Sequence, residues 1–301
     1  MTVSRLDSKS TPPGIEIAPA TLAEAIDEGR RLTDRDRSLI DLLADHRVFT
    51  AEQVARLDFP NDTRARHRLV LLHRRGVLAR FRRCVRPGSQ PWRYTLGLLG
   101  EAIHAASSGD PLPRASAVRE RIIRLAESRT LDHLLGVNDF FTTLSGHAQK
   151  VPNCELLDWW PESRVASICG KIVRPDGYGE WSENDRKLGF FLEYDNGTER
   201  LADVVEKIDK YAELATAGVT KPVLFVFPNT PRNHHFQQLA HRHGVPPSVP
   251  ILSTDTDYLA AAQAAFADRV WLPVGGSRLV RLIDATAASV TPSRRTLKPA
   301  A

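Results

Sequence analysis

The chain has 301 residues, of which 42% are hydrophobic and 26% are charged, and its formal net charge is +5. These proportions are ordinary for a folded globular protein and exclude a largely disordered chain. No stretch approaches the roughly 18 uninterrupted apolar residues of a membrane helix, and the polar first residues contain no secretory apolar core.

The cysteines also limit the class of protein. Cys84, Cys154 and Cys169 are far apart and form no CxxC motif. This spacing excludes a disulfide framework and a cysteine-rich zinc site, and it suits a reducing compartment. We therefore expect a cytoplasmic protein with no membrane partner.

Positive charge is concentrated in one segment. Residues 33–100 contain 14 Arg and 7 acidic residues, which leaves 27 basic and 29 acidic residues in the rest of the chain. A basic patch confined to one segment is typical of a nucleic-acid-binding domain. An arginine-rich solvated surface without such a partner is the alternative that charge leaves open.

Short helices are predicted near the N-terminus. Residues 1–30 are expected to form a flexible leader, although residues 21–31 favour a short helix. Thr33 is placed to cap the next helix, whose first turn is acidic and whose later residues form an apolar stripe. Thr50 has capping-box spacing for a second helix, and residues 62–75 favour a third.

A basic hairpin is predicted after the third helix. Gly76 is placed to end that helix, and residues 78–96 alternate in polarity around a Pro87-Gly88 turn. Three helices followed by such a hairpin form the winged helix-turn-helix pattern. We therefore predict a winged helix DNA-binding domain over residues 31–110.

The third helix has two distinct faces when its residues are placed at 100° intervals. Ala65, Leu69 and Leu72 share the face that we expect to be buried against the first two helices. The rest of the helix and the hairpin supply the expected contacts to double-stranded DNA, namely Arg64, Arg66, His67, Arg68, Arg74, Arg75, Arg80, Arg82, Arg83 and Arg86. A winged helix used only for protein contacts is the alternative, and the density of arginine argues against it.

The second half of the chain has a different pattern. Pro111-Leu-Pro113 is the predicted linker to a second domain over residues 114–284, and residues 285–301 are expected to form a disordered tail. Residues 117–148 favour a long helical region with a break near Gly136.

Strands alternate with helices from Cys154 onward. We expect strands at about 154–159, 165–174, 188–195, 222–227 and 249–253, with further ones at 269–273 and 278–283, and helices at about 199–217, 232–243 and 256–267. This alternation predicts an α/β domain with a mixed central sheet, and hence an α+β fold for the whole chain.

Three carboxylates lie on or beside the predicted strands. Glu193 and Asp195 are two residues apart and share one face of a strand, and Asp176 lies at a strand-to-turn transition. Charged side chains in so apolar a strand require a charged partner or a metal ion. The following helix places Lys207 and Lys210 nearby.

Hard oxygen ligands with a lysine nearby suit Mg²⁺ or Mn²⁺ and the hydrolysis of a phosphodiester. Asp176, Glu193 and Asp195 are therefore candidate metal ligands and catalytic residues, and Lys207 and Lys210 are further catalytic candidates. A structural ion-pair network among Glu193, Asp195 and Lys207 is the alternative that these residues leave open.

Several motifs resemble those of the replication-relaxation family of plasmids and other mobile elements. They are Leu32–Asp36, Leu71–Leu78, Arg174–Gly177, Phe191–Glu199 and Lys207–Tyr211, and the similarity extends over residues 30–245. The resemblance implies a winged helix joined to a restriction-endonuclease-like domain of the PD-(D/E)xK type. It also implies a role in the replication and relaxation of plasmid DNA.

The nuclease motifs match this sequence in part. The resemblance assigns Pro175-Asp176 to the first motif and Glu193 to the second, whereas Asp195 stands where the nuclease pattern has lysine. Lys207 or Lys210 would then supply the lysine from the helix.

The expected function is that of a DNA-binding protein of a plasmid or mobile element, acting in replication or relaxation as a Mg²⁺-dependent nickase. The alternative is a replication accessory protein or transcriptional regulator with an inactive nuclease fold. A homodimer and complexes with replication proteins are the other assemblies that we consider.

Overall fold

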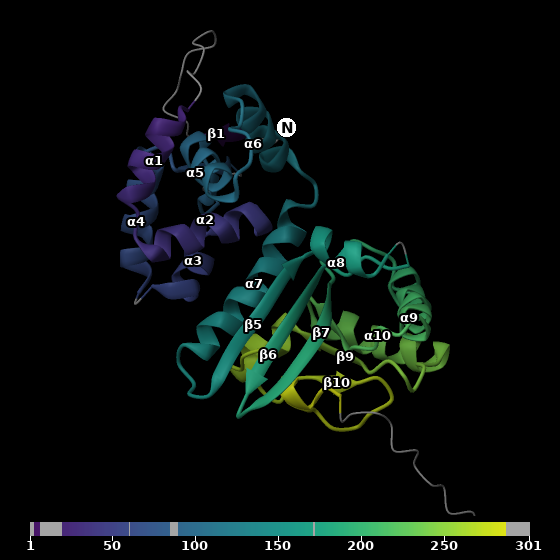
Figure 1. Cartoon of the computed structure of the whole chain (residues 1–301). Helices are drawn as coiled ribbons and strands as arrows, with labels where there is room; N and C mark the ends of the chain where they lie inside the picture. The colour runs from purple at the N-terminus through teal and green to yellow at the C-terminus, as the bar shows by residue number, and fades with distance from the viewer. Residues whose placement is uncertain (1–2, 7–19, 60, 85–89, 171, 287–301) are drawn as a thin grey trace, which may run out of the picture. The chain divides into compact units, whose positions relative to one another are not determined.

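The computed structural model describes residues 3–6, 20–59, 61–84, 90–170 and 172–286 (Figure 1). The chain divides into two compact units, Met1–Gly146 and His147–Ala301. Helices and strands occur in both units, which confirms the predicted α+β class. Within the described ranges, no helix is long and apolar enough to span a membrane.

The first unit combines helices with a four-stranded antiparallel sheet in the order β1-β3-β4-β2. Its elements are β1 (Val3–Leu6), α1 (Leu22–Arg30), α2 (Asp34–His46), β2 (Phe49–Thr50), α3 (Ala51–Asp58), α4 (Asp62–Arg74), β3 (Leu78–Cys84), β4 (Arg93–Leu96), α5 (Leu98–Ser108), α6 (Ala115–Glu127) and α7 (Leu131–Ala148).

Local capping explains where the three predicted helices begin. The Thr33 hydroxyl accepts a hydrogen bond from the Asp36 amide while the Asp36 carboxylate accepts one from the Thr33 amide, and Thr50 begins α3 in the same way. Asn61 caps α4 through the Arg64 amide. These contacts satisfy amide groups that have no partner inside the helix. The predictions of α2, α3 and α4 are confirmed.

The predicted hairpin is confirmed as well. Strand β3 pairs with β4 from Leu78↔Leu96 to Phe81↔Arg93, and β4 also pairs with β2. The Pro87-Gly88 turn lies outside the described residues. Ala65, Leu69 and Leu72 of α4 are fully buried, so the apolar face of this helix packs as its periodicity predicts.

The described parts of residues 1–30 differ from the predicted flexible leader. Residues 3–6 form β1, which pairs with β3, and α1 begins at its Thr21 cap. Ala25 and Glu28 of α1 are buried, so this helix is part of the packed unit. Secondary structure formed by tertiary pairing, as in β1, has no local signal in the sequence.

The boundary between the units also differs from the predicted linker at residues 111–113. Helices α6 and α7 belong to the first unit, because Leu125 and Leu131 are buried in one cluster with Phe81. The predicted helix break near Gly136 is wrong. The chain turns instead between α6 and α7, where the Ser128 hydroxyl accepts a hydrogen bond from the Thr130 amide.

The second unit contains a mixed six-stranded sheet in the order β10-β9-β8-β7-β6-β5. Its elements are β5 (Cys154–Pro161), α8 (Glu162–Ile168), β6 (Gly177–Glu183), β7 (Arg186–Tyr194), α9 (Leu201–Thr216), β8 (Val223–Phe227), α10 (Thr230–His243), β9 (Ile251–Asp255), α11 (Thr256–Ala262), β10 (Leu272–Pro273) and the 3-10 helix η1 (Leu282–Asp284). Strands β7, β8 and β9 are parallel, and the other pairs are antiparallel.

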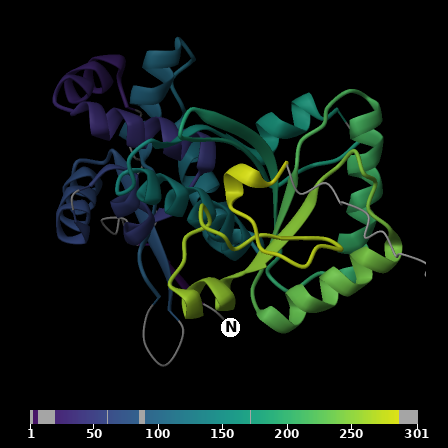
Figure 2. The ribbon, with the colours of Figure 1, turned by 90° about the horizontal axis from the view of Figure 1, so that it is seen from below.

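The two faces of this sheet are covered differently. Helices α8, α9 and α10 pack on one face, where Phe191, Ile208, Phe225 and Phe236 belong to a single buried cluster. The chain that follows α11 covers the other face, and η1 packs against β6 and β7. Figure 2 shows α9 and α10 on one side of the strands and the yellow C-terminal segment on the other.

Two predicted strands of the second unit are wrong. Residues 165–168 belong to helix α8, and the described residues among 169–174 form no strand. Val165 and Cys169 are one helical turn apart and both are buried in the core. Residues 278–283 make only an isolated bridge at Val280 before η1. The strand that sequence missed is β6, whose glycines and acidic residues have low strand propensity.

Candidate functional site

The carboxylates Asp176 and Glu193 come from adjacent antiparallel strands. Gly177, the first residue of β6, pairs with Leu192 of β7, and Asp176 and Glu193 directly adjoin this last pair. The Asp176 amide donates to the Leu192 carbonyl, and the Asp176 carboxylate accepts a 2.8 Å hydrogen bond from the Tyr194 amide. These two bonds tie Asp176, which directly precedes β6, to the last residues of β7 and fix its position.

Helix α9 supplies the partners of Glu193. Lys207 Nζ lies 2.8 Å from Glu193 Oε2, and the Tyr211 hydroxyl donates a 2.6 Å hydrogen bond to Glu193 Oε1. Lys207 and Tyr211 are four residues apart, so they lie on the same face of α9. Lys207 Nζ is also 3.6 Å from a carboxylate oxygen of Glu199.

The electrostatics of this group are dominated by burial. Glu193 is only 2% exposed, and burial together with the nearby Asp176 charge raises the pKa of Glu193 to about 7, against the opposing effect of Lys207. Burial alone would lower the pKa of Lys207, but the charges of Glu193 and Asp176 outweigh it and raise the pKa. Burial and the Glu193 charge raise the pKa of Tyr211 well above its ordinary value.

The structure brings together only part of the predicted catalytic set. Asp195 has partners of its own, because its carboxylate accepts a 2.7 Å hydrogen bond from Arg232 Nε and another from the Gly197 amide. Lys210 is exposed on α9, whereas Lys207 contacts Glu193. In the part of the chain that the structure describes, no group of three or more His, Cys, Asp or Glu side chains is arranged to hold a metal ion. The acidic site is therefore the Asp176–Glu193 pair with Lys207.

A second candidate surface is the exposed face of α4 in the first unit. The side chains of Arg64, Arg66, His67 and Arg74 are exposed on this helix, opposite its buried face. Arg66 makes a 3.2 Å ion pair with the exposed carboxylate of Glu52, a contact that solvent screens and that contributes little stability.

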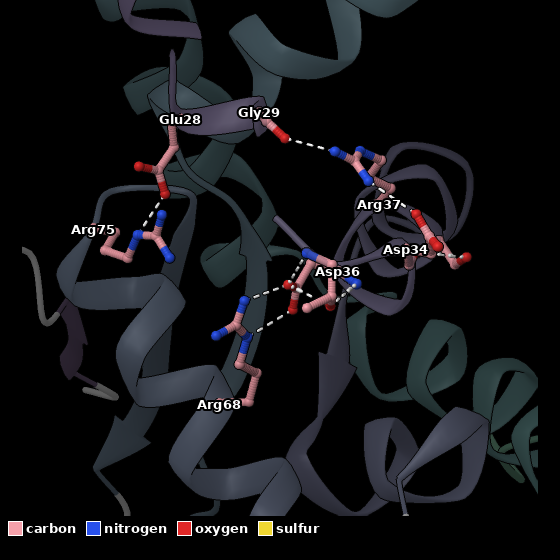
Figure 3. Close-up of polar contacts among 9 residues, drawn as sticks. Glu28, Gly29, Asp34, Asp36, Arg37, Arg68 and Arg75 are labelled. Carbon is pink, nitrogen blue, oxygen red and sulfur yellow. Dashed lines mark hydrogen bonds and ion pairs between the residues drawn. The ribbon is translucent and has the colours of Figure 1, made fainter. Parts of the chain in front are cut away.

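Two other arginines of this region face the interior of the unit instead (Figure 3). Arg68 donates from Nε to Asp36 Oδ1 at 2.8 Å and from its second nitrogen to Asp36 Oδ2. Arg75, which caps α4, lies 2.5 Å from the carboxylate of Glu28 in α1. Both carboxylates are less than a tenth exposed. Arg68 and Arg75 therefore hold α2 and α1 against α4.

The hairpin presents an arginine pair around one aromatic ring. The guanidinium carbons of Arg80 and Arg82 each lie 4.3 Å from the ring centroid of Trp92. Arg82 and Trp92 are the next residues in register after the Phe81↔Arg93 pair, so they lie side by side across the two strands. Both cations contact the ring face, where the attraction is electrostatic.

Two of the predicted DNA contacts have side chains outside the part of the chain that the structure describes. Arg86 lies outside the described residues, and only the backbone of Arg83 is described, as part of β3. Sequence reasoning missed Trp92 and Arg232. The alternation of β3 and β4 could have indicated Trp92, since it places an aromatic residue opposite Arg82. No local pattern could have paired Asp195 with Arg232, because the two are separated by 37 residues.

The amino-acid sequence can be compared with those of known proteins. No curated protein and no solved structure matches the chain. A family model described as Replication-relaxation matches residues 40–230, which is more than half of the chain and includes α4, the hairpin and the acidic site. The chain therefore belongs to the replication-relaxation family.

Proposed function

We propose that this protein binds double-stranded DNA of a plasmid or mobile element and acts in its replication or relaxation. The first unit is the winged helix of this proposal, with α4 as the recognition helix and the β3–β4 hairpin as the wing. The observation behind it is the exposed row of Arg64, His67 and Arg74 on a helix whose opposite face is buried. A helix with this arrangement fits the major groove of DNA.

The proposed contact set is smaller than the sequence predicted. Arg68 and Arg75 are paired with Asp36 and Glu28, so they act by positioning α4. Among the residues that the structure describes, the proposed DNA contacts are then Arg64, Arg66, His67 and Arg74 from the helix, with Arg80 and Arg82 from the hairpin. Guanidinium groups bind phosphates and guanine edges in paired hydrogen bonds, which suits both elements.

A binding measurement with matched charge variants tests this proposal. Fluorescence anisotropy of a labelled duplex with the full chain should show Arg74→Ala weakening binding strongly. Arg119→Ala, which removes an exposed positive charge from α6, should have little effect. Equal losses in the two variants, or wild-type protein that binds no duplex, would refute the assignment of α4 as the DNA-reading helix.

A second candidate function is cleavage of one DNA strand at the acidic site. The observation that favours it is the cross-strand pair of Asp176 and Glu193 with Lys207 in contact, on a mixed sheet flanked by helices. This arrangement supports a PD-(D/E)xK-like domain in which Lys207 replaces the lysine missing at position 195. It is also compatible with an inactive fold, so activity is decided by experiment.

The donor set of the site fits a divalent cation. Carboxylate oxygens are the ligands that Mg²⁺ and Mn²⁺ prefer, and one or two carboxylates with waters are enough to hold Mg²⁺. Asp176 and Glu193 would hold the ion, which when bound polarises a phosphate and activates water. Lys207 would then lie where its ammonium group stabilises negative charge on the phosphate.

Supercoiled plasmid provides the test of cleavage. With Mg²⁺ or Mn²⁺, the wild-type protein should convert it to the open circular form, and EDTA should prevent this. Asp176→Asn should abolish conversion while duplex affinity is retained. If no open circular product forms under any of these conditions, the protein is a non-catalytic DNA-binding member of its family and the cleavage candidate is rejected.

A further inference from the structure

An aromatic row crosses the sheet face on which the acidic site lies. Trp160 of β5 pairs with Tyr178 of β6, which pairs with Phe191 of β7. The ring centroids are 4.6 Å apart for Trp160 and Tyr178, and 5.9 Å apart for Tyr178 and Phe191. Tyr211 follows at 5.8 Å and donates its hydroxyl hydrogen bond to Glu193. The inner end of the row is therefore part of the acidic site.

The outer end of the row lies at the edge of the sheet. Strand β5 is the last strand in the sheet order, and α8 follows it directly (Figure 1). Trp160 is partly buried, and the Cζ atom of Arg164 lies 4.2 Å from its ring centroid. Arg164 is exposed, and within the described ranges it forms no ion pair with a carboxylate. Trp160 thus contacts both the exposed guanidinium of Arg164 and the ring of Tyr178.

This stack lies close to the acidic site. Tyr178 and Asp176 are two residues apart, which corresponds to about 7 Å along an extended chain. Trp160 is on the neighbouring strand, about 5 Å to the side of Tyr178. A nucleic-acid strand with a phosphate at Asp176 and Glu193 would therefore place a neighbouring base near Arg164 and Trp160.

We propose that Arg164 and Trp160 form a stacking platform for an unpaired nucleobase beside the Asp176–Glu193 pair. The inference rests on the proposed DNA function and specifies its substrate class, which is duplex DNA interrupted by a short single-stranded stretch. Bases stack on aromatic rings and on guanidinium planes, and the exposed guanidinium of Arg164, whose Cζ lies 4.2 Å from the Trp160 centroid, offers such a plane. Bases inside an intact duplex are already stacked and do not reach a platform of this kind.

A competing explanation is that Arg164 only shields Trp160 from water. The two explanations predict different results when another cationic side chain replaces the planar guanidinium. Lysine would retain the positive charge and much of the aliphatic cover but would lose the stacking plane. Arg164→Lys should therefore lose the preference for unpaired bases if the platform exists, and should keep it if Arg164 is merely a cover or a point charge.

The experiment compares two labelled DNA molecules bound by the full chain, a plain duplex and the same duplex with a short central bubble. Wild-type protein should bind the bubble about tenfold more tightly, since one stacked base contributes an effect of this size. Trp160→Leu should bring the ratio of the two affinities to about one while leaving plain-duplex affinity unchanged. Trp160→Phe, which retains an aromatic ring, should keep most of the preference and shows that the site still folds.

A matched control and an optical signal complete the design. Arg269→Ala removes an exposed arginine of the same unit and should leave the affinity ratio unchanged. A 2-aminopurine base in the bubble should lose fluorescence on binding wild-type protein, because stacking quenches it, and should not do so with Trp160→Leu. An affinity ratio of one for wild-type protein, or a Trp160→Leu variant that weakens both DNA molecules equally, would overturn the platform.

The two proposals fail in different ways. Absolute affinity of the wild-type protein for plain duplex tests the proposed DNA function. The ratio of bubble affinity to duplex affinity, together with 2-aminopurine quenching, tests the platform alone. Normal duplex binding with no bubble preference would therefore reject the platform and leave the proposed function in place.

Discussion

Arg68 donates hydrogen bonds from two of its guanidinium nitrogens to the Asp36 carboxylate, and this ion pair joins α4 to the first turn of α2. Asp36 is only 1% exposed, so its charge depends on the partners that surround it. Burial would raise the pKa of Asp36, but hydrogen bonds from Arg68 and Thr33 lower it below the ordinary value. The pair thus holds α4, the recognition helix of the proposed winged helix, against α2.

The first prediction concerns this pair. Arg68→Ala should lower the free energy of unfolding by about 3 kcal/mol, because it leaves a buried carboxylate without its charged partner. Urea denaturation of the two proteins measures the difference. Arg64→Ala is the matched control on the exposed face and should change stability by less than about 0.5 kcal/mol. If Arg68→Ala is as stable as wild type but binds DNA weakly, Arg68 contacts DNA and does not act by positioning α4.

The second prediction is the salt dependence of DNA binding. Arg64, Arg66, Arg74, Arg80 and Arg82 would neutralise about five phosphates, which corresponds to a loss of about 500-fold in affinity between 50 and 200 mM salt. Removing Arg74 should reduce the slope of the logarithm of affinity against the logarithm of salt concentration by about one. Anisotropy titrations at several salt concentrations measure both quantities. A nearly flat dependence would contradict a phosphate-binding role for these arginines.

Local signals predicted α2, α3, α4 and the β3–β4 hairpin of the first unit. Thr33 and Thr50 have side chains that cap helices within three residues, and the spacing of Ala65, Leu69 and Leu72 identifies a buried face. Such signals depend only on neighbours in the chain, so they can be seen in the sequence.

The parts that sequence did not predict depend on distant partners. Arg68 and Arg64 are the same residue type in the same helix, and only the position of Asp36, 32 residues away, separates a structural role from a surface one. Asp195 has a carboxylate on the predicted strand, but its charged partner is Arg232, 37 residues away. Side-chain partners at such separations are determined by packing, which a single sequence does not show.

The third prediction concerns the aromatic residue of the wing. Trp92→Leu should weaken DNA binding about tenfold, because Arg80 and Arg82 lose the ring that orders them and must be immobilised on binding. The salt slope should stay unchanged, since both positive charges remain. Trp92→Phe retains an aromatic face and should bind nearly as well as wild type. A reduced salt slope in Trp92→Leu would indicate instead that the wing contacts themselves had been lost.

The fourth prediction is a loss of stability in acid caused by His46. Burial lowers the pKa of His46 to about 3, whereas the unfolded chain has an ordinary histidine pKa near 6.5. The folded state therefore binds this proton only in strong acid, and the unfolded state binds it more readily. The contribution of neutral His46 to stability is complete above pH 6.5 and declines as the pH falls toward 3, by about 1 kcal/mol per pH unit.

A substitution isolates this effect from the titration of carboxylates. His46→Phe removes the titrating group from the site beside Phe49, where an aromatic ring already packs. The difference in unfolding free energy between wild type and variant should shift in favour of the variant as the pH is lowered from 7 to 4. A difference that is independent of pH over this interval would show that His46 does not remain neutral in the folded protein.

The last prediction separates Asp176 from Asp195 by a measurement that requires no catalysis. A divalent ion that binds the folded protein raises its melting temperature by mass action, so Mg²⁺ or Mn²⁺ should stabilise the wild-type chain. Asp176→Asn should abolish this increment, because Asp176 shares the acidic site with Glu193, whose pKa its charge raises. Asp195→Asn should lower the starting melting temperature, since it weakens the pair with Arg232, but the metal-dependent increment should persist. Loss of the increment in Asp195→Asn alone would place the metal at the end of β7 beside Arg232, and the acidic site would need to be redefined around Asp195.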